Sequence, residues 1–404
     1  MRDAAHVAVE RAARHSYGRL LAVLARTTGN IAAAEDALSD ALASALKTWA
    51  VSGVPDAPDA WLITVARRRA VDRIRHERTA ANHTGTLTLL TEERGVADEP
   101  SDARLNLLFV CAHEAIDRDM HAPLMLQTVL GLTAAQIAPL FLLRPATLSQ
   151  QLVRAKTKIA KAGIRFDLPT PSRWTDRLPS VLDAIYAAFA AGATARDEAM
   201  MEEALYLVEL CVSQLPEEPE AKGLLALCLY TLARFGADRD EDGRFVPLSA
   251  QDIHGWRISL IDRAEIALHD AGKHKRFGRY QLEAAIQSAH CHQKRTGTPQ
   301  WPAILHLYKT LSIVAPSVGA TVGHAAALHG ASLSETALDL LDTIAVKCED
   351  YQPYWATRAA VLAAIGQRTE AEAAYTRAAE LSDDPATRQW LTAQKQKSDP
   401  ATAI

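Results

Sequence analysis

The chain has few aromatic residues and no recognisable strand pattern. Phe, Trp and Tyr make up 6% of its 404 residues, whereas hydrophobic residues as a class reach 49%. Alanine, leucine, arginine and glutamate dominate, and Gly and Pro cluster between periodic segments, which favours helices over strands. The hydrophobic content excludes a mainly disordered chain, and the length exceeds that of one ordinary core. We therefore expect an all-α protein of several domains.

The sequence also lacks the patterns that accompany disulfides, metal sites and catalysis. Its five cysteines are scattered without a CxxC pair, so neither a disulfide framework nor a zinc-finger spacing is present. The best candidate for a metal site is His290, Cys291 and His292, but adjacent residues on a helix face different directions and cannot easily hold one ion. No Gly-rich phosphate loop or nucleophile motif is recognisable. We expect a protein that is not an enzyme and needs no metal or cofactor.

Long hydrophobic runs and a strong basic charge are missing as well. No segment offers about 20 apolar residues in a row, so we expect a cytoplasmic protein that makes no use of a membrane. Lys and Arg number 44 against 48 Asp and Glu. Because released counterions supply most non-specific affinity for DNA, a chain of this charge would bind duplex DNA weakly by itself. A function on DNA would require a partner.

Residues 132–162 have the pattern of two short helices joined by a tight turn. Thr133 and Gln136 fit a T-x-x-Q capping box at the start of the first helix. Pro139 should interrupt that helix, whereas Pro145 suits the first turn of the second one. The buried stripe of the second helix is expected at Leu148, Leu152, Ala155 and Ile159. The pattern predicts a helix-turn-helix.

The opposite face of this second helix carries side chains that hydrogen-bond base edges and phosphates in the major groove. These are Thr147, Ser149, Gln150, Gln151 and Arg154. Three lysines follow as expected phosphate contacts: Lys156, Lys158 and Lys161. The alternative is a surface helix whose polar face is merely solvated.

Residues 9–78 are predicted to form three helices with short connections. The second should begin near Asn30 and bury one stripe, consisting of Ala34, Leu38, Leu42, Ala45 and Trp49. Asp36, Asp40 and Lys47 then lie on the opposite face. Two carboxylates one turn apart on an exposed face suit a basic partner surface, although most such pairs are simply solvated.

Two prolines in the segment 53–59 forbid a regular helix there, and an arginine-rich helix should begin near Trp61. Its buried stripe is expected at Leu62, Ile63, Ala66, Ala70 and Ile74. Its arginines are Arg67, Arg68, Arg69, Arg73, Arg75 and Arg78. Clustered guanidinium groups can hold phosphates or stack on unpaired bases, so this helix favours an anionic partner over a solubilising role.

The rest of the chain divides into a linker and a long helical part. Residues 80–103 lack helical periodicity and are predicted to form a flexible linker, and two prolines within 168–173 mark a boundary near residue 170. Close to the C-terminus the spacing matches a tetratricopeptide repeat, at Trp355, Ala359, Leu362, Gly366, Ala371, Tyr375 and Ala378, then Pro385. The expected division is 1–79, the linker 80–103, 104–167 and 168–404.

Three segments, in this order and spacing, resemble an extracytoplasmic-function sigma factor of bacterial RNA polymerase: AAAEDALSDAL, PDAPDAWLITVARRRAVDRIR and LTAAQIAPLFLLRPATLSQQLVRAKTKI. The part from DRLPSVLDAIYAAF onward is similar to the subgroup with a C-terminal tetratricopeptide-like extension. This resemblance implies core RNA polymerase as partner, through its beta-prime clamp helices and beta flap, and promoter-specific initiation of transcription. The extension would modulate activity, directly or through a protein partner.

The resemblance also assigns roles to individual residues. The acidic second helix would dock on core polymerase through Glu35, Asp36 and Asp40. The minus-ten element, with one unstacked base held by the loop 53–59, would be engaged by Pro55, Asp56, Trp61, Arg67, Arg68, Arg73 and Arg75. The minus-thirty-five element would be read by Arg144, Thr147, Ser149, Gln150, Gln151, Arg154 and Lys158.

The sequence departs from the family pattern at three positions and in one segment. Ser39 stands where glutamine is usual, Arg68 stands where many members have asparagine, and Pro139 lies within the first helix of the helix-turn-helix. The subgroup's Asn-Glu-Gly-Tyr is absent after Phe189.

A conventional helix-turn-helix regulator is the alternative, with the repeats binding a protein or a small ligand. Such a regulator has no need for an acidic helix, a proline loop and an arginine helix in that order. The order of the three elements therefore favours the sigma factor.

Overall fold

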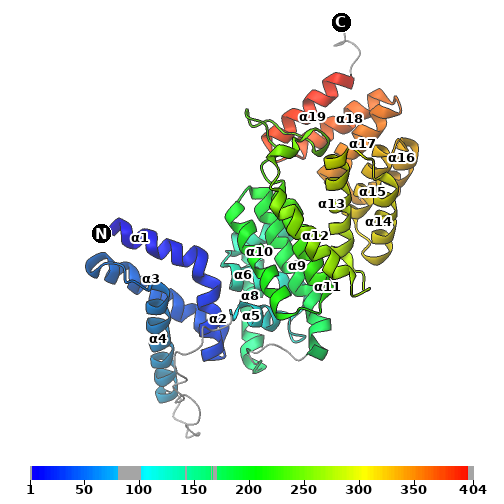
Figure 1. Ribbon diagram of the computed structural model, residues 1–404. Coiled ribbons are helices and arrows are strands. Elements are labelled where there is room, and N and C mark those ends of the chain that lie inside the picture. Colours follow the sequence, from blue (N-terminus) through cyan, green and yellow to red (C-terminus); the bar gives the residue numbers. More distant parts are fainter. Residues whose placement is uncertain (1, 81–101, 142, 165, 167–170, 399–404) are drawn as a thin grey trace. The chain divides into compact units, whose positions relative to one another are not determined.

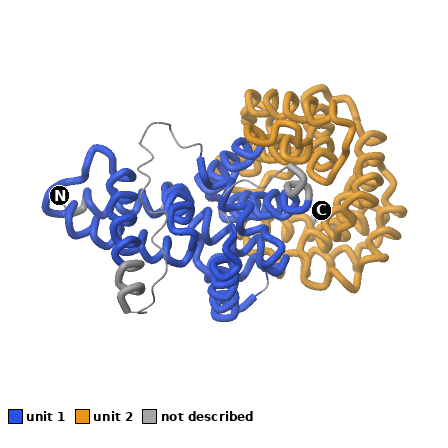
Figure 2. The backbone as a smooth tube through the Cα atoms, turned by 90° about the horizontal axis from the view of Figure 1, so that it is seen from below, with its two compact units in different colours: residues 1–211 blue, residues 212–404 orange. Residues whose placement is uncertain are grey.

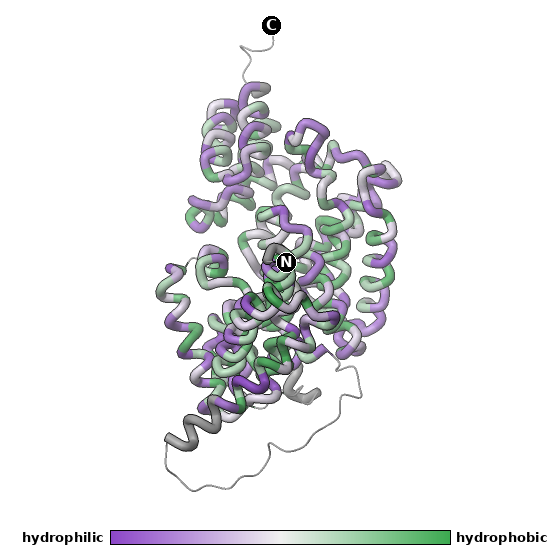
Figure 3. Tube along the Cα trace, turned by 90° about the vertical axis from the view of Figure 1, so that its left-hand side faces the viewer, coloured by the Kyte–Doolittle hydropathy of each residue, from purple (hydrophilic) through white to green (hydrophobic). Residues whose placement is uncertain are grey.

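The computed structural model describes residues 2–80, 102–141, 143–164, 166 and 171–398 (Figure 1). Every regular element within these ranges is a helix, apart from an isolated antiparallel bridge between Arg239 and Phe245. Hydrophilic and hydrophobic residues alternate along the helices, as expected for elements with one buried face (Figure 3). The all-α prediction is confirmed. Nearly all of the predicted linker, residues 81–101, lies outside the described residues.

The chain folds as two compact units, residues 1–211 and 212–404 (Figure 2). The first unit contains α1 (Arg2–Arg11), α2 (Tyr17–Thr28), α3 (Ile31–Ser52), α4 (Pro58–Ala80), α5 (Arg104–Cys111), α6 (His121–Leu130), α7 (Ala134–Ile137), α8 (Pro145–Lys161), α9 (Pro171–Ala195) and most of α10 (Glu198–Gln214). The second contains α11 (Pro219–Ala233), α12 (Ile258–Gly272), α13 (Arg279–Thr296), α14 (Trp301–Val314), α15 (Val318–Gly330), α16 (Ser334–Asp342), α17 (Gln352–Ala364), α18 (Arg368–Glu380) and α19 (Pro385–Ser398).

The predicted start of α3 and its buried face are both confirmed. The side chain of Asn30 accepts a hydrogen bond from the backbone N–H of Ala33, so the residue caps the helix. Four of the five predicted stripe residues are buried, and Leu42 is half-buried. At the end of the stripe Trp49 packs edge-on against Trp61 of α4, with ring centroids 5.4 Å apart. This contact is part of the packing of α4 against α3.

The helix-turn-helix forms as its local signals predict. Thr133 and Gln136 exchange both hydrogen bonds of a capping box. The helix α7 then spans only four residues and continues as a 3-10 turn, Ala138–Phe141, because Pro139 has no N–H with which to extend it. Pro145 occupies the first turn of α8, and the whole predicted stripe of that helix is buried. Both predictions about α7 and α8 are confirmed.

The helices α9 and α10 belong to the first compact unit. α9 packs against α5 and α6. At the start of α5 the guanidinium of Arg104 is buried between Asp102 and Glu203 of α10, and it lies 4.7 Å from the ring centre of Tyr206. The boundary between compact units therefore falls near residue 211 rather than near residue 170. The functional division of the chain at 79, 103 and 167 stays a prediction.

One helix of the described chain, within α9, is long and apolar enough to cross a membrane by length and composition alone. It spans Asp176–Ala195, and half of it is buried inside the protein. Its buried side chains include Leu178, Val181, Ile185 and Phe189. A face covered by neighbouring helices is the pattern of a core helix.

The second unit is built from neighbouring helices that pack in sequence. α11 packs against both α12 and α13, and Glu220 near its start accepts hydrogen bonds from the backbone N–H groups of Tyr280 (3.0 Å) and Gln281 (3.2 Å) at the start of α13. α17 packs against α18, and α18 against α19. The predicted repeat residues between positions 355 and 378, apart from Gly366, meet in one apolar cluster of α17, α18 and α19. Their assignment to a tetratricopeptide repeat stays a prediction.

Two buried hydrogen bonds hold His121 at the start of α6, one to the segment before this helix and one to α9. Its Nε2–H donates to the carbonyl oxygen of Ile116 at 3.1 Å, and its Nδ1 lies 3.2 Å from Ser180 Oγ, which donates to it when the ring is neutral. Burial lowers the pKa of His121 below its usual value. The folded chain therefore holds this ring neutral.

This geometry predicts a loss of stability in mild acid. As the pH falls below the unfolded value of about 6.5, the unfolded chain takes up a proton that the folded chain resists. The contribution of His121 to the free energy of unfolding is present above that pH and is lost below it. Urea unfolding at pH 7.5 and 5.5 should show a smaller pH-dependent loss in His121→Gln than in the wild type. An equal loss in both proteins would contradict the assignment.

Candidate nucleic-acid interface

The acidic residues of α3 fall into two environments. Asp36 and Asp40 are exposed, as the helical spacing predicts. Glu35 is largely covered, because Lys156 of α8 places its Nζ 2.6 Å from both carboxylate oxygens. The two side chains of this pair are only 18% and 9% exposed. The structure thus brings one predicted polymerase-binding residue against the helix-turn-helix.

The arginine face of α4 is exposed where its side chains are described. Arg67, Arg68 and Arg69 all lie in solvent, and Arg69 Nη2 lies 3.5 Å from Ser44 Oγ of α3. The side chains of Arg73 and Arg75 lie outside the described residues. Trp61 at the start of this helix is half-buried. Adjacent exposed guanidinium groups give α4 a surface suited to phosphates.

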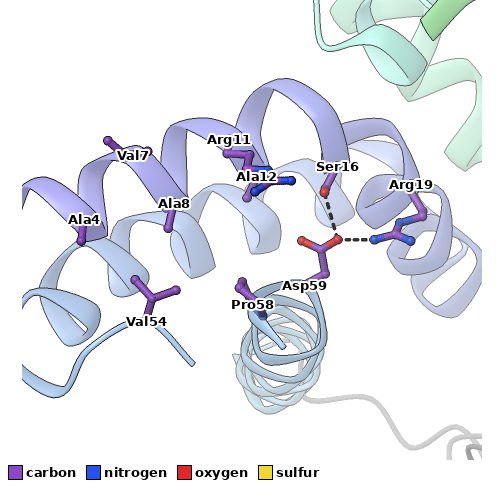
Figure 4. A pocket seen from close by; sticks show the side chains of 10 residues that line it. All are labelled: Ala4, Val7, Ala8, Arg11, Ala12, Ser16, Arg19, Val54, Pro58 and Asp59. Carbon is purple, nitrogen blue, oxygen red and sulfur yellow. Dashed lines mark hydrogen bonds and ion pairs between the residues drawn. The ribbon is translucent and has the colours of Figure 1, made fainter. Parts of the chain in front are cut away.

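A cavity of about 660 Å³ opens beside the proline loop that precedes α4 (Figure 4). Ala4, Val7 and Ala8 of α1 form one wall, and Val54 of the loop and Pro58, the first residue of α4, form the other. The cavity is therefore mainly apolar along its length. The prediction that residues 53–59 contain no helix and that the helix begins near Trp61 is wrong at its end, because a proline fits the first helical position.

One end of this cavity is polar. The carboxylate of Asp59 accepts a hydrogen bond from Ser16 Oγ at 2.9 Å and another from Arg19, and Arg11 also lines the space. Pro55 is half-buried and Asp56 exposed, and neither belongs to the lining. Arg11, Ser16 and Arg19 could not be predicted from the sequence, because all three precede the motifs and Asp59 lies about 40 positions away from Ser16 and Arg19.

The predicted recognition face of α8, with Arg144 just before the helix, is exposed along most of its length. The exposed members are Arg144, Thr147, Ser149, Gln150, Arg154 and Lys158. Gln151 is half-buried, and its Oε1 is enclosed and accepts no hydrogen bond within the described chain. Lys158 lies 3.3 Å from Asp117 and keeps 51% of its side chain exposed. Most of the predicted set is therefore available to a ligand.

The prediction made for Lys156 is wrong. It was expected to contact phosphate, but it is buried, with 7% of the residue exposed, and it is paired with Glu35. Its position on α8 follows Ala155, so it lies at the edge of the buried stripe rather than on the open face. Its burial depends on Glu35, a partner 121 positions away that the helical pattern does not reveal.

The helices of the N-terminal segment and of the helix-turn-helix segment also meet at α2 and α6. A Cβ added to Gly18 of α2 would lie 1.8 Å from the carbonyl oxygen of Val129, so only glycine fits this contact. Tyr17 lies beside Gly131, where an added Cβ would come within 3.1 Å of its ring. Burial, and then the charge of Glu35, raise the pKa of Tyr17. These contacts and the ion pair belong to one buried surface.

His290 and Cys291 point to different partners. The ring of His290 faces Trp301 at 6.1 Å, and burial lowers its pKa to about 4, whereas Arg234 Nη1 lies 3.6 Å from Cys291 Sγ. Among the residues that the structure describes, no group of three or more His, Cys, Asp or Glu side chains is placed to hold a metal ion.

Because Asp59 accepts two hydrogen bonds, we expect the removal of its carboxylate to destabilise the fold. Asp59→Ala leaves Ser16 and Arg19 without their acceptor and should lower the free energy of unfolding by about 1 kcal/mol, since the site is partly exposed. Asp56→Ala, an exposed aspartate in the loop just before α4, is the matched control and should change little. Equal losses in the two variants, measured by urea unfolding, would show that the Asp59 contacts contribute nothing.

Comparisons with known proteins agree with this arrangement. A family described as sigma-70 region 2 matches residues 12–79, and a family of unknown function, DUF6596, matches residues 177–272. The uncharacterized protein R00370 of Rhizobium meliloti (strain 1021) is 32% identical over 398 residues, which cover 95% of this chain and 94% of that protein. No solved structure matches the chain. The chain therefore carries a sigma-70 region 2 and belongs to the same family as this Rhizobium meliloti protein.

Proposed function

We propose that the chain is a sigma factor of the extracytoplasmic-function type, which binds core RNA polymerase and directs transcription from specific promoters. One observation carries the proposal: a sigma-70 region 2 is followed by a capped helix-turn-helix whose recognition face is open. A conventional regulator would have no use for region 2, so the match also favours the sigma factor over that alternative. The polymerase performs the chemistry, and the chain works in the cytoplasm.

Core polymerase is proposed to bind the acidic face of α3 and, through its beta flap, the helix-turn-helix segment. Asp36 and Asp40 present two carboxylates one turn apart to solvent. Such a surface suits the basic face of a beta-prime clamp helix, because complementary charge steers association and fixes its register. Glu35 would join them once Lys156 is displaced.

The minus-ten element is proposed to bind across α4 and the proline loop. Exposed Arg67 and Arg68 supply phosphate contacts. The apolar cavity beside Val54 and Pro58, with Arg19 and Asp59 at one end, suits an unstacked base. Unstacking a base costs a few kcal/mol, so a preformed space with polar groups at its end offsets part of that cost.

The minus-thirty-five element is proposed to bind the open face of α8. Arg154 and Gln150 are exposed and are side-chain types that hydrogen-bond base edges, and the exposed Lys158 and Arg144 suit phosphates. The chain has no excess of basic residues. This supports the proposal that polymerase supplies most of the affinity for DNA.

The C-terminal extension is proposed to modulate activity, directly or through a protein partner. Because α9 and α10 are part of the first compact unit, a truncation that tests this role must keep residues 1–214. A cut at residue 170 would remove helices that cover α5 and α6 and would report on folding instead.

The docking proposal predicts a large effect of charge reversal on α3. Asp36→Arg combined with Asp40→Arg should weaken binding to purified core polymerase by roughly tenfold or more, because like charges would face each other. Both positions are exposed, so thermal unfolding should change little. Glu335→Arg with Asp339→Arg, which reverses two exposed acids one turn apart on α16 and outside both proposed polymerase surfaces, is the matched control. Unchanged affinity in the α3 variant would contradict the docking surface.

If α8 reads the minus-thirty-five element, each substitution on its open face should weaken binding to the promoter. Gln150→Ala and Arg154→Ala should each cost about 1 to 3 kcal/mol in binding of the polymerase complex to a matched promoter. The loss should shrink on a promoter whose upstream element is scrambled. Arg368→Ala, an exposed arginine of α18, controls for the general loss of a positive charge. Equal losses on both promoters would show that these side chains do not read sequence.

A further inference from the structure

We propose that a polar cavity beside the start of α6 binds a small zwitterion of the amino-acid class, and that the bound molecule releases Lys158 of α8 to DNA. No residue that lines this cavity is among those assigned above to polymerase or to promoter elements. The binding site stands without the proposed function, whereas the effect on DNA rests on it.

The cavity measures about 570 Å³ and lies within the first compact unit. Two segments line it, residues 112–121, which lead into α6, and residues 176–180 of α9. Its volume falls in the range of about 300 to 1,000 Å³ that is typical of small-molecule sites. The space is therefore large enough for an organic molecule and larger than a single ion needs.

Charges of both signs surround this space. Glu114, Asp117 and Asp176 contribute carboxylates, and Arg118 and Arg177 contribute guanidinium groups. An anion alone would face three carboxylates, and a cation alone would face two guanidinium groups, so each would meet repulsion as well as attraction. A ligand that carries both an ammonium group and a carboxylate complements both sets, because guanidinium groups bind carboxylates through charge-assisted hydrogen bonds.

A buried hydroxyl adds an acceptor for the ammonium group. Ser180 lines the cavity, and its Oγ lies 3.2 Å from Nδ1 of His121. The other ring nitrogen of His121 donates to the carbonyl oxygen of Ile116, so Nδ1 of the neutral ring accepts the proton of Ser180. The Ser180 oxygen can then only accept a further hydrogen bond. A hydroxyl fixed in this way favours a ligand N–H over a ligand oxygen.

The remaining lining of the cavity is apolar. Ala112 and Ile116 border it, and both side chains are buried. Small-molecule sites commonly combine an apolar wall with a few placed polar groups. An amino acid has its ammonium group, its carboxylate and a hydrocarbon segment within a few bonds of one another. This combination of wall and charges favours an amino acid over an inorganic ion or an uncharged sugar.

Asp117 connects the cavity to the proposed recognition helix. Its carboxylate borders the cavity and lies 3.3 Å from Lys158 Nζ of α8. An ammonium group in the cavity competes with Lys158 for this carboxylate, and Lys158 is proposed to contact promoter DNA. Because both side chains of the pair are more than half exposed, the pair is weak, and its release should raise promoter affinity only about two- to fivefold.

The binding test uses the purified full chain without polymerase. Each standard amino acid is titrated in turn by calorimetry, and at least one should bind with one-to-one stoichiometry and raise the temperature of thermal unfolding. The N-acetyl derivative and the methyl ester of that amino acid, which each lack one charge, should bind roughly tenfold more weakly. Absence of binding by all of them, or equal binding of a singly charged derivative, would overturn the proposal.

Two variants locate the site. Arg118→Gln and Asp176→Asn each remove one charge from an exposed side chain of the lining and should each weaken binding roughly tenfold. Asp119→Asn is the matched control, because Asp119 is exposed and directly follows Arg118 but does not line the cavity. Binding as strong in both variants as in the wild type would place the ligand elsewhere and overturn the assignment.

The effect on DNA is measured with the polymerase complex at a matched promoter. A saturating concentration of the amino acid should raise the affinity about two- to fivefold in the wild type and leave it unchanged in Lys158→Gln, which lacks the released charge. An equal gain in both proteins, or no gain in the wild type, would overturn the release of Lys158. If the chain binds the amino acid but not polymerase, the proposed function fails although the site stands. The two failures are therefore distinguishable.

Discussion

Lys156 and Glu35 are charged side chains that would each be costly to bury alone, and the first compact unit buries them together where α8 meets α3. The geometry of α8 makes this possible. Lys156 follows Ala155 of the buried stripe, so burial of the stripe turns the lysine toward α3 while Arg154 and Lys158 stay outside. A single helix thus carries the proposed recognition face on one side and an intramolecular contact on another.

Features that depend on neighbours in sequence could be predicted from the sequence. The capping box at Thr133, the shortened helix at Pro139 and the stripe of α8 each follow from residues within a few turns. The exposure of Asp36 and Asp40 follows in the same way from helical spacing. Features that depend on distant partners could not be predicted. The burial of Lys156, the bonds from Ser16 and Arg19 to Asp59, and the placement of Arg104 beside α10 all join residues at least 40 positions apart.

The boundary between the two compact units also depends on distant partners and could not be predicted from the sequence. Two prolines near residue 170 suggested a boundary, but α9 beyond them has an apolar face that packs on α5 and α6. The segment matched by the family of unknown function begins inside this helix, at residue 177. In the sequence the helix-turn-helix lies between region 2 and that segment, and α9 packs on α5 and α6, the two helices that precede it.

The account as a whole requires that a chain with little affinity for DNA of its own redirects a larger enzyme. The direct measurement combines the purified chain with core RNA polymerase and genomic DNA and maps the 5′ ends of the transcripts. The account predicts a limited set of new start sites that share two spaced upstream elements and that disappear when the chain is left out. Identical transcripts with and without the chain would contradict it.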